Sequence, residues 1–398
     1  NSSVFNNGKG ENEVGNSLIL NPSLVKNMQY MFRDCAKFNA PIGTWDTSNV
    51  TTMEEMFYNA EVFNQEIRTW KVNNVTNFSS MFNGATAFLN TYNVETTPDI
   101  IWFILPFFNK TELQNAIQQW IIDPTPVIKT YDEINLWDVR QITDMSELFK
   151  NMSSFNDDIS NWDVSSVTNM EGMFYSSKSF NQPLNSWDVS SVTNMKNMFR
   201  HAWKFNENIS EWDVSNVTDM SYMFNDSNVF NQDISAWTVS SVTTMNSMFN
   251  LTYQFNQDIG GWDVSNVTNA TSMFKYAVNF NQDISGWDVS NITIMHSMFS
   301  NASAFNQPLE QWNVSNVNNM MRMFSYASSF NQPLEQWDVS NVTTMREMFD
   351  WARVFNQEIR SWNIDNVTSF TGMFTTATAM NNNYNAPPTP DATWFTST

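Results

Sequence analysis

Carboxylates at a fixed spacing of 25 residues are the side chains best placed to do chemistry in this chain. An Asp directly follows Trp in eight of the twelve Trp-bearing copies of a repeated motif, at Asp46, Asp138, Asp163, Asp188, Asp213, Asp263, Asp288 and Asp338. Stacked carboxylates repel one another unless something compensates, and calcium binding or the paired carboxylates of a glycosidase would be two uses for them. A third use is local, with each carboxylate accepting hydrogen bonds from nearby backbone or from the Ser two residues on. We favour the local use, because an enzyme has one site and this feature recurs in most copies. The candidates for an ion site are Asp163, Asp188, Asp213, Asp263 and Asp288.

Few other side chains suit catalysis or metal binding. Two His and one Cys among 398 residues argue against zinc sites, Cys–His nucleophiles and a disulfide framework. The 40 acidic and 19 basic residues give a net charge of −21, which argues against nucleic-acid binding. No stretch of 18 apolar residues is present, so no membrane insertion is expected. We therefore expect a non-enzymatic protein with no cofactor, calcium being the one ion to consider.

Asn-x-Ser/Thr sequons are candidate glycosylation sites. One column of them lies four residues after Trp, and others occur late in the repeat, where more room is expected. The candidates are Asn49, Asn74, Asn216 and Asn266 in the column, and Asn225, Asn250 and Asn301 elsewhere. If copies stack at the strand spacing of ~4.8 Å, glycans in the column would be crowded. The alternative is that the repeat consensus spells a sequon and carries no glycan.

Aromatic residues outside the repeated columns are candidate binding residues. They are Trp203, Tyr222, Tyr253, Tyr276, Tyr326 and Trp351. An exposed ring offers a platform on which a sugar or a protein side chain can stack. These six residues therefore predict a binding surface for carbohydrate or for a partner protein.

The repeat itself must position all of these residues. Trp recurs every 25 residues from Trp45 to Trp70 and from Trp137 to Trp362, and Leu20 opens an earlier copy, which makes 13 copies. Positions are counted below from this Trp. Apolar residues at −3, 0, +2 and +5 predict a short strand. Met at +8 and +11, Phe at +12 and a small residue at +15 predict one face of a short helix.

Such a copy cannot bury its own apolar face, whereas stacked copies can. The sequence therefore predicts an α/β repeat, a solenoid of 25-residue coils with one short parallel strand and one short helix in each coil. Asn at +19 recurs in nearly every copy. A polar residue held between apolar columns predicts a buried Asn ladder that bonds the backbone of each turn and the stacked neighbour.

The copies fall into two arrays. The first covers residues 20–106 and holds three coils plus a closing segment, and the second covers 137–379 and holds ten coils. The closing segment recurs at 380–398, because Tyr92 and Trp102 match Tyr384 and Trp394 at an offset of 292 residues. Residues 107–136 are predicted to form a helical cap, and the Asn-, Gly- and Ser-rich residues 1–19 a flexible segment.

The pattern Trp-Asp-Val-Ser-x-Val-Thr-x-Met-x-x-Met-Phe…Phe-Asn resembles the BspA-like leucine-rich-repeat surface-protein family, specifically its 25-residue repeat of unknown function. The resemblance implies a leucine-rich-repeat-like solenoid, displayed outside the cell and used in adhesion or surface architecture, without catalytic residues. One departure is that Val242 and its equivalents stand where the leucine-rich pattern places Asn. Horseshoe curvature is therefore not assumed.

Together these features predict an extracellular or cell-surface (secreted) structural protein. The first array begins at Leu20 without the helical cap that precedes Trp137, and an uncapped solenoid end invites another chain. We therefore expect head-to-tail self-association into a fibre or surface layer. The alternative is an adhesin that binds carbohydrate or a receptor through the outer solenoid surface.

Overall fold

The computed structural model describes residues 25–103 and 105–396, which form two compact units. The first unit contains the described residues up to Phe107 together with Gln118–Val139. The second contains Phe108–Ile117 and the described residues from Arg140 onward. The predicted flexible segment 1–19 lies outside the described residues.

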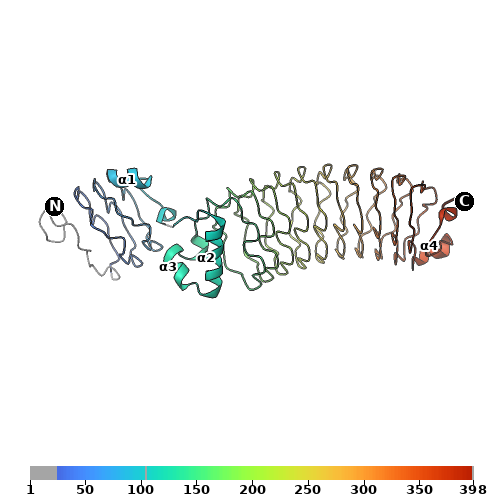
Figure 1. Ribbon diagram of the computed structural model, residues 1–398, viewed down its shortest axis with the longest axis horizontal. Helices are drawn as coiled ribbons and strands as arrows, with labels where there is room; N and C mark the ends of the chain where they lie inside the picture. Colours follow the sequence, from blue (N-terminus) through green and yellow to red (C-terminus); the bar gives the residue numbers. More distant parts are fainter. Residues whose placement is uncertain (1–24, 104, 397–398) are drawn as a thin grey trace. The chain divides into compact units, whose positions relative to one another are not determined.

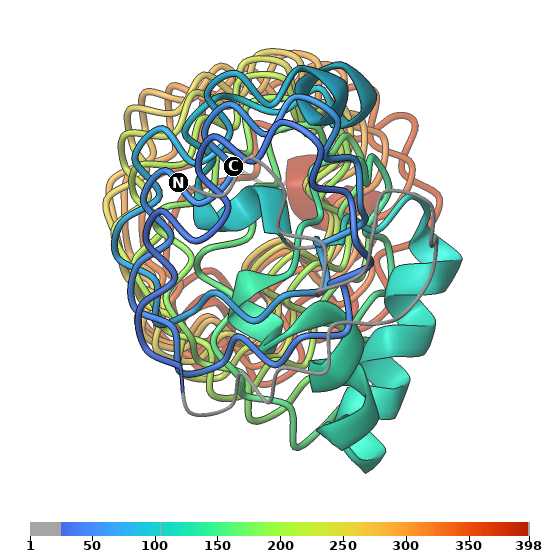
Figure 2. The same ribbon diagram turned by 90° about the vertical axis from the view of Figure 1, so that its left-hand side faces the viewer.

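Each unit contains a stack of 25-residue coils, seen side-on for the second unit in Figure 1 and end-on in Figure 2. Isolated parallel bridges join position +7 of one coil to position +7 of the next. They run from Asn27 to Asn77 in the first unit and from Asp144 to Ser369 in the second. The predicted stacking of tandem copies into a solenoid is therefore confirmed.

The prediction of a strand and a helix in every coil is wrong. The described residues form bridges but no strand in the coils, and no helix covers the Met-x-x-Met-Phe segment. The helices that do form lie at the ends of the arrays and in the segment that joins them in sequence. They are α1 (Thr86–Tyr92), η2 (Ile100–Phe103), α2 (Lys110–Ile122), α3 (Thr125–Tyr131), η3 (Ile134–Leu136), α4 (Thr378–Asn383) and α5 (Ala392–Thr396).

Left-handed residues explain why the helix is missing. Positions +10 and +14 of each described coil have positive φ, as at Asn197 (57°) and His201 (58°), and a right-handed helix cannot pass through them. Alternate amides instead reach the next coil, as from Glu147 N to Glu171 O at 2.8 Å. The amides between them close turns, as from Lys150 N to Glu147 O at 3.1 Å. These three-residue turns direct Met and Phe inward at nearly helical spacing, which is why the sequence pattern imitates a helix.

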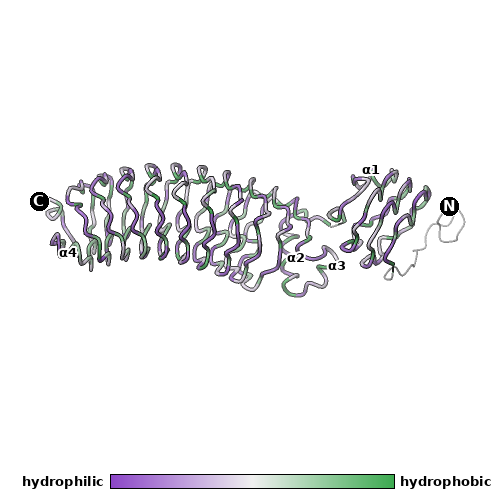
Figure 3. Tube along the Cα trace, turned by 180° about the vertical axis from the view of Figure 1, so that it is seen from behind, coloured by the Kyte–Doolittle hydropathy of each residue, from purple (hydrophilic) through white to green (hydrophobic). Residues whose placement is uncertain are grey.

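Columns of Trp, Phe and Met fill the inside of each stack, and apolar and polar residues alternate along the coil (Figure 3). The Trp indole also donates a hydrogen bond to the preceding coil, as from Trp262 Nε1 to Ile234 O at 3.2 Å. The rings of Trp287 and Trp312 lie 6.4 Å apart and nearly parallel. Each Trp therefore joins its coil to the one before it by packing and by a buried hydrogen bond.

The Asn ladder forms as predicted, although its side chains are half-buried or exposed rather than buried. The backbone N–H of Asn281 donates to Oδ1 of Asn256 at 2.9 Å, and the same bond recurs from coil to coil. Gln282 Nε2 also donates to Asn256 O at 2.9 Å. The side-chain oxygen of each Asn thus accepts a hydrogen bond from a backbone N–H that has no acceptor within its own turn.

The two closing segments make the same contacts on the last coil of each array. Phe82 N donates to Thr96 O at 2.9 Å, and Phe374 N donates to Pro388 O at 3.0 Å. Trp102 packs against Phe82, and Trp394 packs in the same way against Phe374, at ring distances of 5.7 and 5.2 Å. Each segment thereby takes the place of a following coil.

The segment predicted as a helical cap, residues 107–136, contains α2, α3 and η3. Leu113, Ala116 and Ile117 of α2 are buried, as the apolar spacing predicts. Trp120 lies edge-on to Trp137, with ring centres 5.7 Å apart.

Candidate functional site

The Asp column makes local hydrogen bonds. Asp163 Oδ1 accepts from Ser165 N at 3.1 Å and from Ser165 Oγ at 2.6 Å. Asp188, Asp213, Asp263 and Asp288 accept from the N–H of the Ser two residues on in the same way. The local use expected from the sequence is therefore present at all five candidates.

The same bonds lower the pKa of four of these carboxyls. Donation from the Ser265 hydroxyl and backbone N–H holds the pKa of Asp263 below its ordinary value, and the pKa values of Asp188, Asp213 and Asp288 are lowered for the same reason. The described residues contain no group of three His, Cys, Asp or Glu side chains that could hold a metal ion. Each carboxylate is thus an anion stabilised by its own turn.

The Asn side chains of the sequon column donate hydrogen bonds to the preceding coil. Asn74 Nδ2 donates to Ser48 O at 2.7 Å, and Asn216 and Asn266 donate to Ser190 O and Ser240 O at 2.8 Å. A glycan attached to this nitrogen would have to leave between stacked coils. Asn49 occupies the same column position in the first unit.

The sequons late in the repeat differ in accessibility. Asn225 is 3% exposed, so the prediction that it has room for a glycan is wrong. Its side chain, at +13, is buried, whereas Lys150 and Arg200 at the same position of earlier coils are half-buried. Asn250 and Asn301 are half-buried, and Asn301 Nδ2 donates to Ser300 Oγ at 3.0 Å.

The six candidate aromatic residues lie along the turn edge of the second unit, the residues at +9, +10, +13, +14 and +16 of each coil. Trp203, Tyr253, Tyr276 and Tyr326 are exposed, whereas Tyr222 and Trp351 are half-buried. Tyr326 and Trp351 stack on one another, with ring centres 5.5 Å apart. Trp203 Nε1 donates to Asp226 Oδ2 at 3.0 Å. The candidates therefore lie in separate groups along the edge.

An alternation of cations and rings was missed by the sequence analysis. Lys150 lies over the ring of Tyr175 at 5.5 Å, and Arg200 lies 5.4 Å from Tyr175 and 4.8 Å from Tyr222. Lys150, Tyr175 and Arg200 occupy position +13 of three successive coils. The spacing of 25 residues between a cation, a ring and a second cation could have predicted these contacts from the sequence. Stacked coils bring residues at that spacing next to one another.

A polar depression of about 230 Å³ opens beside this alternation in the second unit. It is lined by Glu147, Lys150, Glu171, Gly172, Tyr175, Asn197 and Arg200. Arg200 Nη1 donates to Asn197 Oδ1 at 3.3 Å, while Arg200 Nε is buried and has no hydrogen-bond partner among the described residues. This depression is the part of the turn edge that combines space with an unsatisfied charged group.

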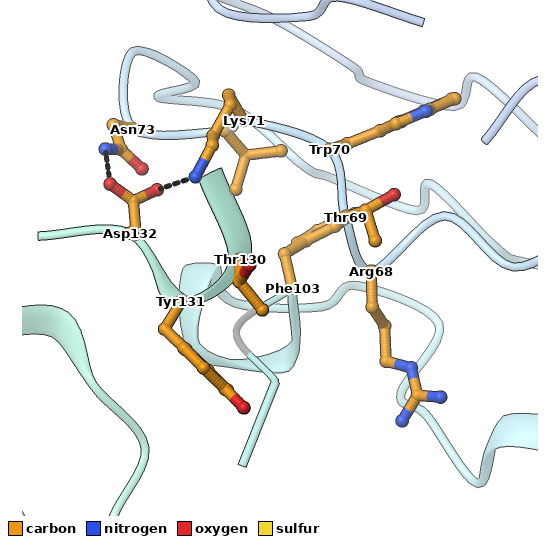
Figure 4. A pocket seen from close by; sticks show the side chains of 10 residues that line it. Arg68, Thr69, Trp70, Lys71, Asn73, Phe103, Thr130, Tyr131 and Asp132 are labelled. Carbon is orange, nitrogen blue, oxygen red and sulfur yellow. Dashed lines mark hydrogen bonds and ion pairs between the residues drawn. The ribbon is translucent and has the colours of Figure 1, made fainter. Parts of the chain in front are cut away.

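A second pocket, within the first unit, has a structural role (Figure 4). Asp132 accepts from Lys71 Nζ at 3.3 Å and from Asn73 Nδ2 at 2.9 Å. The volume of this pocket, about 10 Å³, holds little more than one water molecule. The two bonds join the residue after α3 to the last coil of the first array.

Among the described residues no helix is long and apolar enough to span a membrane. None of the curated proteins compared with the chain matches it. Solved structures with a distant likeness include TLR13 in complex with ssRNA13 (9% identity over 60% of this chain and 48% of that chain, TM-score 0.18). They also include Toll from Drosophila in complex with Spatzle (12% identity, 58% and 38%, TM-score 0.20) and the plant peptide hormone receptor RGFR1 with RGF2 (7% identity, 56% and 47%, TM-score 0.15). This chain spans about half the length of these proteins or less, and the TM-scores are too low to carry an argument about function.

Family membership rests on the sequence itself. The family described as "Mycoplasma protein of unknown function, DUF285" matches residues 2–120, 117–228, 201–307 and 279–387. These four stretches together span nearly the whole chain, and the chain belongs to this family.

Proposed function

We propose that this chain is a non-enzymatic extracellular structural protein that acts through its long repetitive surface. The observation that carries the proposal is that the repeated polar columns are engaged in holding the coils. Asp263 bonds its own turn, Asn256 bonds the next coil, and Asn266 bonds the preceding one. The resemblance of the motif to BspA-like leucine-rich-repeat surface proteins supports the extracellular location.

Surface labelling tests this proposal. Antibodies against the purified chain should label intact cells that produce it, and permeabilisation should add little signal. Labelling that requires permeabilisation would contradict an extracellular role. Hydrolytic activity that is lost in Asp263→Asn would contradict the non-enzymatic role.

A head-to-tail fibre is the more specific form of the proposal. The carbonyls of Gln29, Met31 and Arg33 receive no backbone hydrogen bond from the described residues, and in a fibre they would be acceptors for another chain. Because the amide of Phe374 already donates to the closing segment, the donors would be side chains of that segment rather than a continued backbone ladder. Electron microscopy of the purified protein should show fibres, which deletion of residues 1–44 should abolish. Short isolated rods at high concentration would contradict the fibre.

An adhesin is the second candidate, and the exposed rings of the turn edge favour it. Trp203 is 40% exposed and Tyr326 is 44% exposed, so each ring offers a surface on which a sugar can stack. Binding on a glycan array should fall in Trp203→Ala and Tyr326→Ala. Val354→Ala is the matched control, because Val354 is equally exposed at 43% and has no ring. Binding that is unchanged in both ring variants would contradict this candidate.

A further inference from the structure

We propose that the polar depression at Arg200 binds a carboxylate-bearing sugar, such as a terminal uronic acid of a glycan. The site goes beyond the structural role proposed above and does not depend on it. It is formed by three successive coils of the second unit, which contribute Glu147, Gly172 and Asn197 at the same position, +10.

A missing side chain creates the space. The coils on either side carry Glu147 and Asn197 where this coil has Gly172. A Cβ at Gly172 would lie 3.6 Å from Glu147 Cγ and 3.7 Å from Tyr175 Cβ, both ordinary contact distances. A side chain would therefore fit at Gly172, and its absence leaves the depression open.

Arg200 supplies the charge that recognises a carboxylate. Lys150 is paired with Glu147 at 2.6 Å, and Lys196 lies 3.7 Å from Glu171, so both carboxylates of the depression have a cation.

No carboxylate of the described residues is within 4 Å of the Arg200 guanidinium. The rings of Tyr175 and Tyr222 hold the guanidinium on either side, and its Nε is buried and therefore closed to a ligand. A planar carboxylate would bind at the two Nη groups, which a guanidinium presents side by side.

The rest of the lining favours a sugar as the carrier of that carboxylate. It presents acceptors at Glu147 and Glu171, a donor and an acceptor at Asn197, and no aliphatic side chain. Pockets for apolar ligands are lined mainly by apolar groups, whereas hydroxyl groups can bond to the polar side chains of this lining. The charge distribution agrees, because residues 205–274 carry no Lys or Arg while Lys150, Lys178, Lys196, Arg200 and Lys204 gather in the coils around the depression.

Titration of the whole chain with D-glucuronate, followed by saturation-transfer NMR, tests the site. D-glucose lacks the carboxylate and acetate lacks the ring, and both should bind at least about tenfold more weakly than glucuronate, the ratio that one lost hydrogen bond to a charged group produces. Binding should also weaken as salt is added.

Two variants test the residues separately. Arg200→Met removes the charge, and Gly172→Asn fills the space with a residue that already adopts the same backbone conformation at Asn197. Each should weaken glucuronate binding at least about tenfold. Gly372→Asn, at position +10 of the last coil, is the matched control and should leave binding unchanged. Absence of glucuronate binding, equal binding of acetate, or unchanged binding in both site variants would overturn the proposal.

Discussion

The inner columns and the turn edge of the second unit differ in how much their residues vary from coil to coil. The inner columns repeat Trp, Met and Phe with little change, whereas position +13 of the turn edge reads Lys150, Tyr175, Arg200, Asn225 and Asn250 in successive coils. An inner side chain must match the coils on both sides because its ring stacks on theirs. Most edge side chains are half-buried or exposed and vary from coil to coil, although Asn225 is buried. The columns therefore specify the fold, and departures along the edge specify what the surface can bind.

The largest expected difference is between a Trp of the column and a Trp of the edge. Trp262→Ala removes a ring that is 3% exposed and one of the two donors to Ile234 O, so the free energy of unfolding should fall by ~3–5 kcal/mol. Trp203→Ala removes an exposed ring and should cost under ~1 kcal/mol. Denaturant unfolding measures both, and equal losses would contradict the distinction.

The Asn ladder should give the next largest effect. Asn256→Ala removes the acceptor for Asn281 N and one of the two acceptors for Gln282 Nε2, which should cost ~1–2 kcal/mol of unfolding free energy. Asn185→Ala is the matched control, because Asn185 is exposed and outside the ladder. A loss at Asn185 as large as that at Asn256 would show that the ladder contributes nothing specific.

Replacing a strained residue at a left-handed position with Gly should change the free energy of unfolding by a smaller amount and in the opposite direction. Thr376 has φ of 57°, which is unfavourable for a β-branched residue, and Gly84 occupies the equivalent position of the first array. Thr376→Gly should raise the unfolding free energy by ~0.5–1 kcal/mol. Its neighbour Thr375 does not have positive φ, so Thr375→Gly should lower stability. Destabilisation by Thr376→Gly would contradict this account of the turn.

The Asp column should give the smallest effect at neutral pH. Asp263→Ala removes an exposed local bond and should cost about 0.5 kcal/mol. Because the folded-state pKa of Asp263, Asp188 and Asp288 is lowered, their contribution is complete above the unfolded pKa near 3.8 and is lost as pH falls through the lower folded value. The melting temperature should therefore be nearly constant from about pH 7 to 5 and fall below about pH 4. Adding a chelator at pH 7 should leave it unchanged, and a fall of many degrees would instead support calcium binding by this column.

The sequence was sufficient to predict the repeat, the stacked coils, the inner columns and the Asn ladder. Those features depend on residue types that recur at one spacing, which a single sequence displays directly. The helix was predicted wrongly because Met170, Met173 and Phe174 have helical spacing, while the left-handed conformation of Gly172 and Ser176 prevents a helix. Gly, Asn or Asp occupies +14 in six of the thirteen copies, and this was the overlooked sign of left-handed turns.

The candidate site was harder to predict. Gly172, Asn197 and Arg200 are ordinary residues in a variable part of the repeat, and none belongs to a known motif. The depression exists because a residue without a side chain lies between two coils that have one, which requires the register of three coils. Asn225 shows the same limit, since its sequon gives no sign that its side chain is buried.

The most direct test measures stability and binding together in two variants, Arg200→Met on the turn edge and Asn256→Ala in the ladder, which lie in different coils. If columns specify the fold and the edge specifies binding, Arg200→Met should lose glucuronate affinity at least about tenfold while its melting temperature changes by less than about 2 °C. Asn256→Ala should show the opposite, a lower melting temperature with unchanged glucuronate affinity below the transition. Variants in which stability and affinity fall together would contradict the separation of fold from binding.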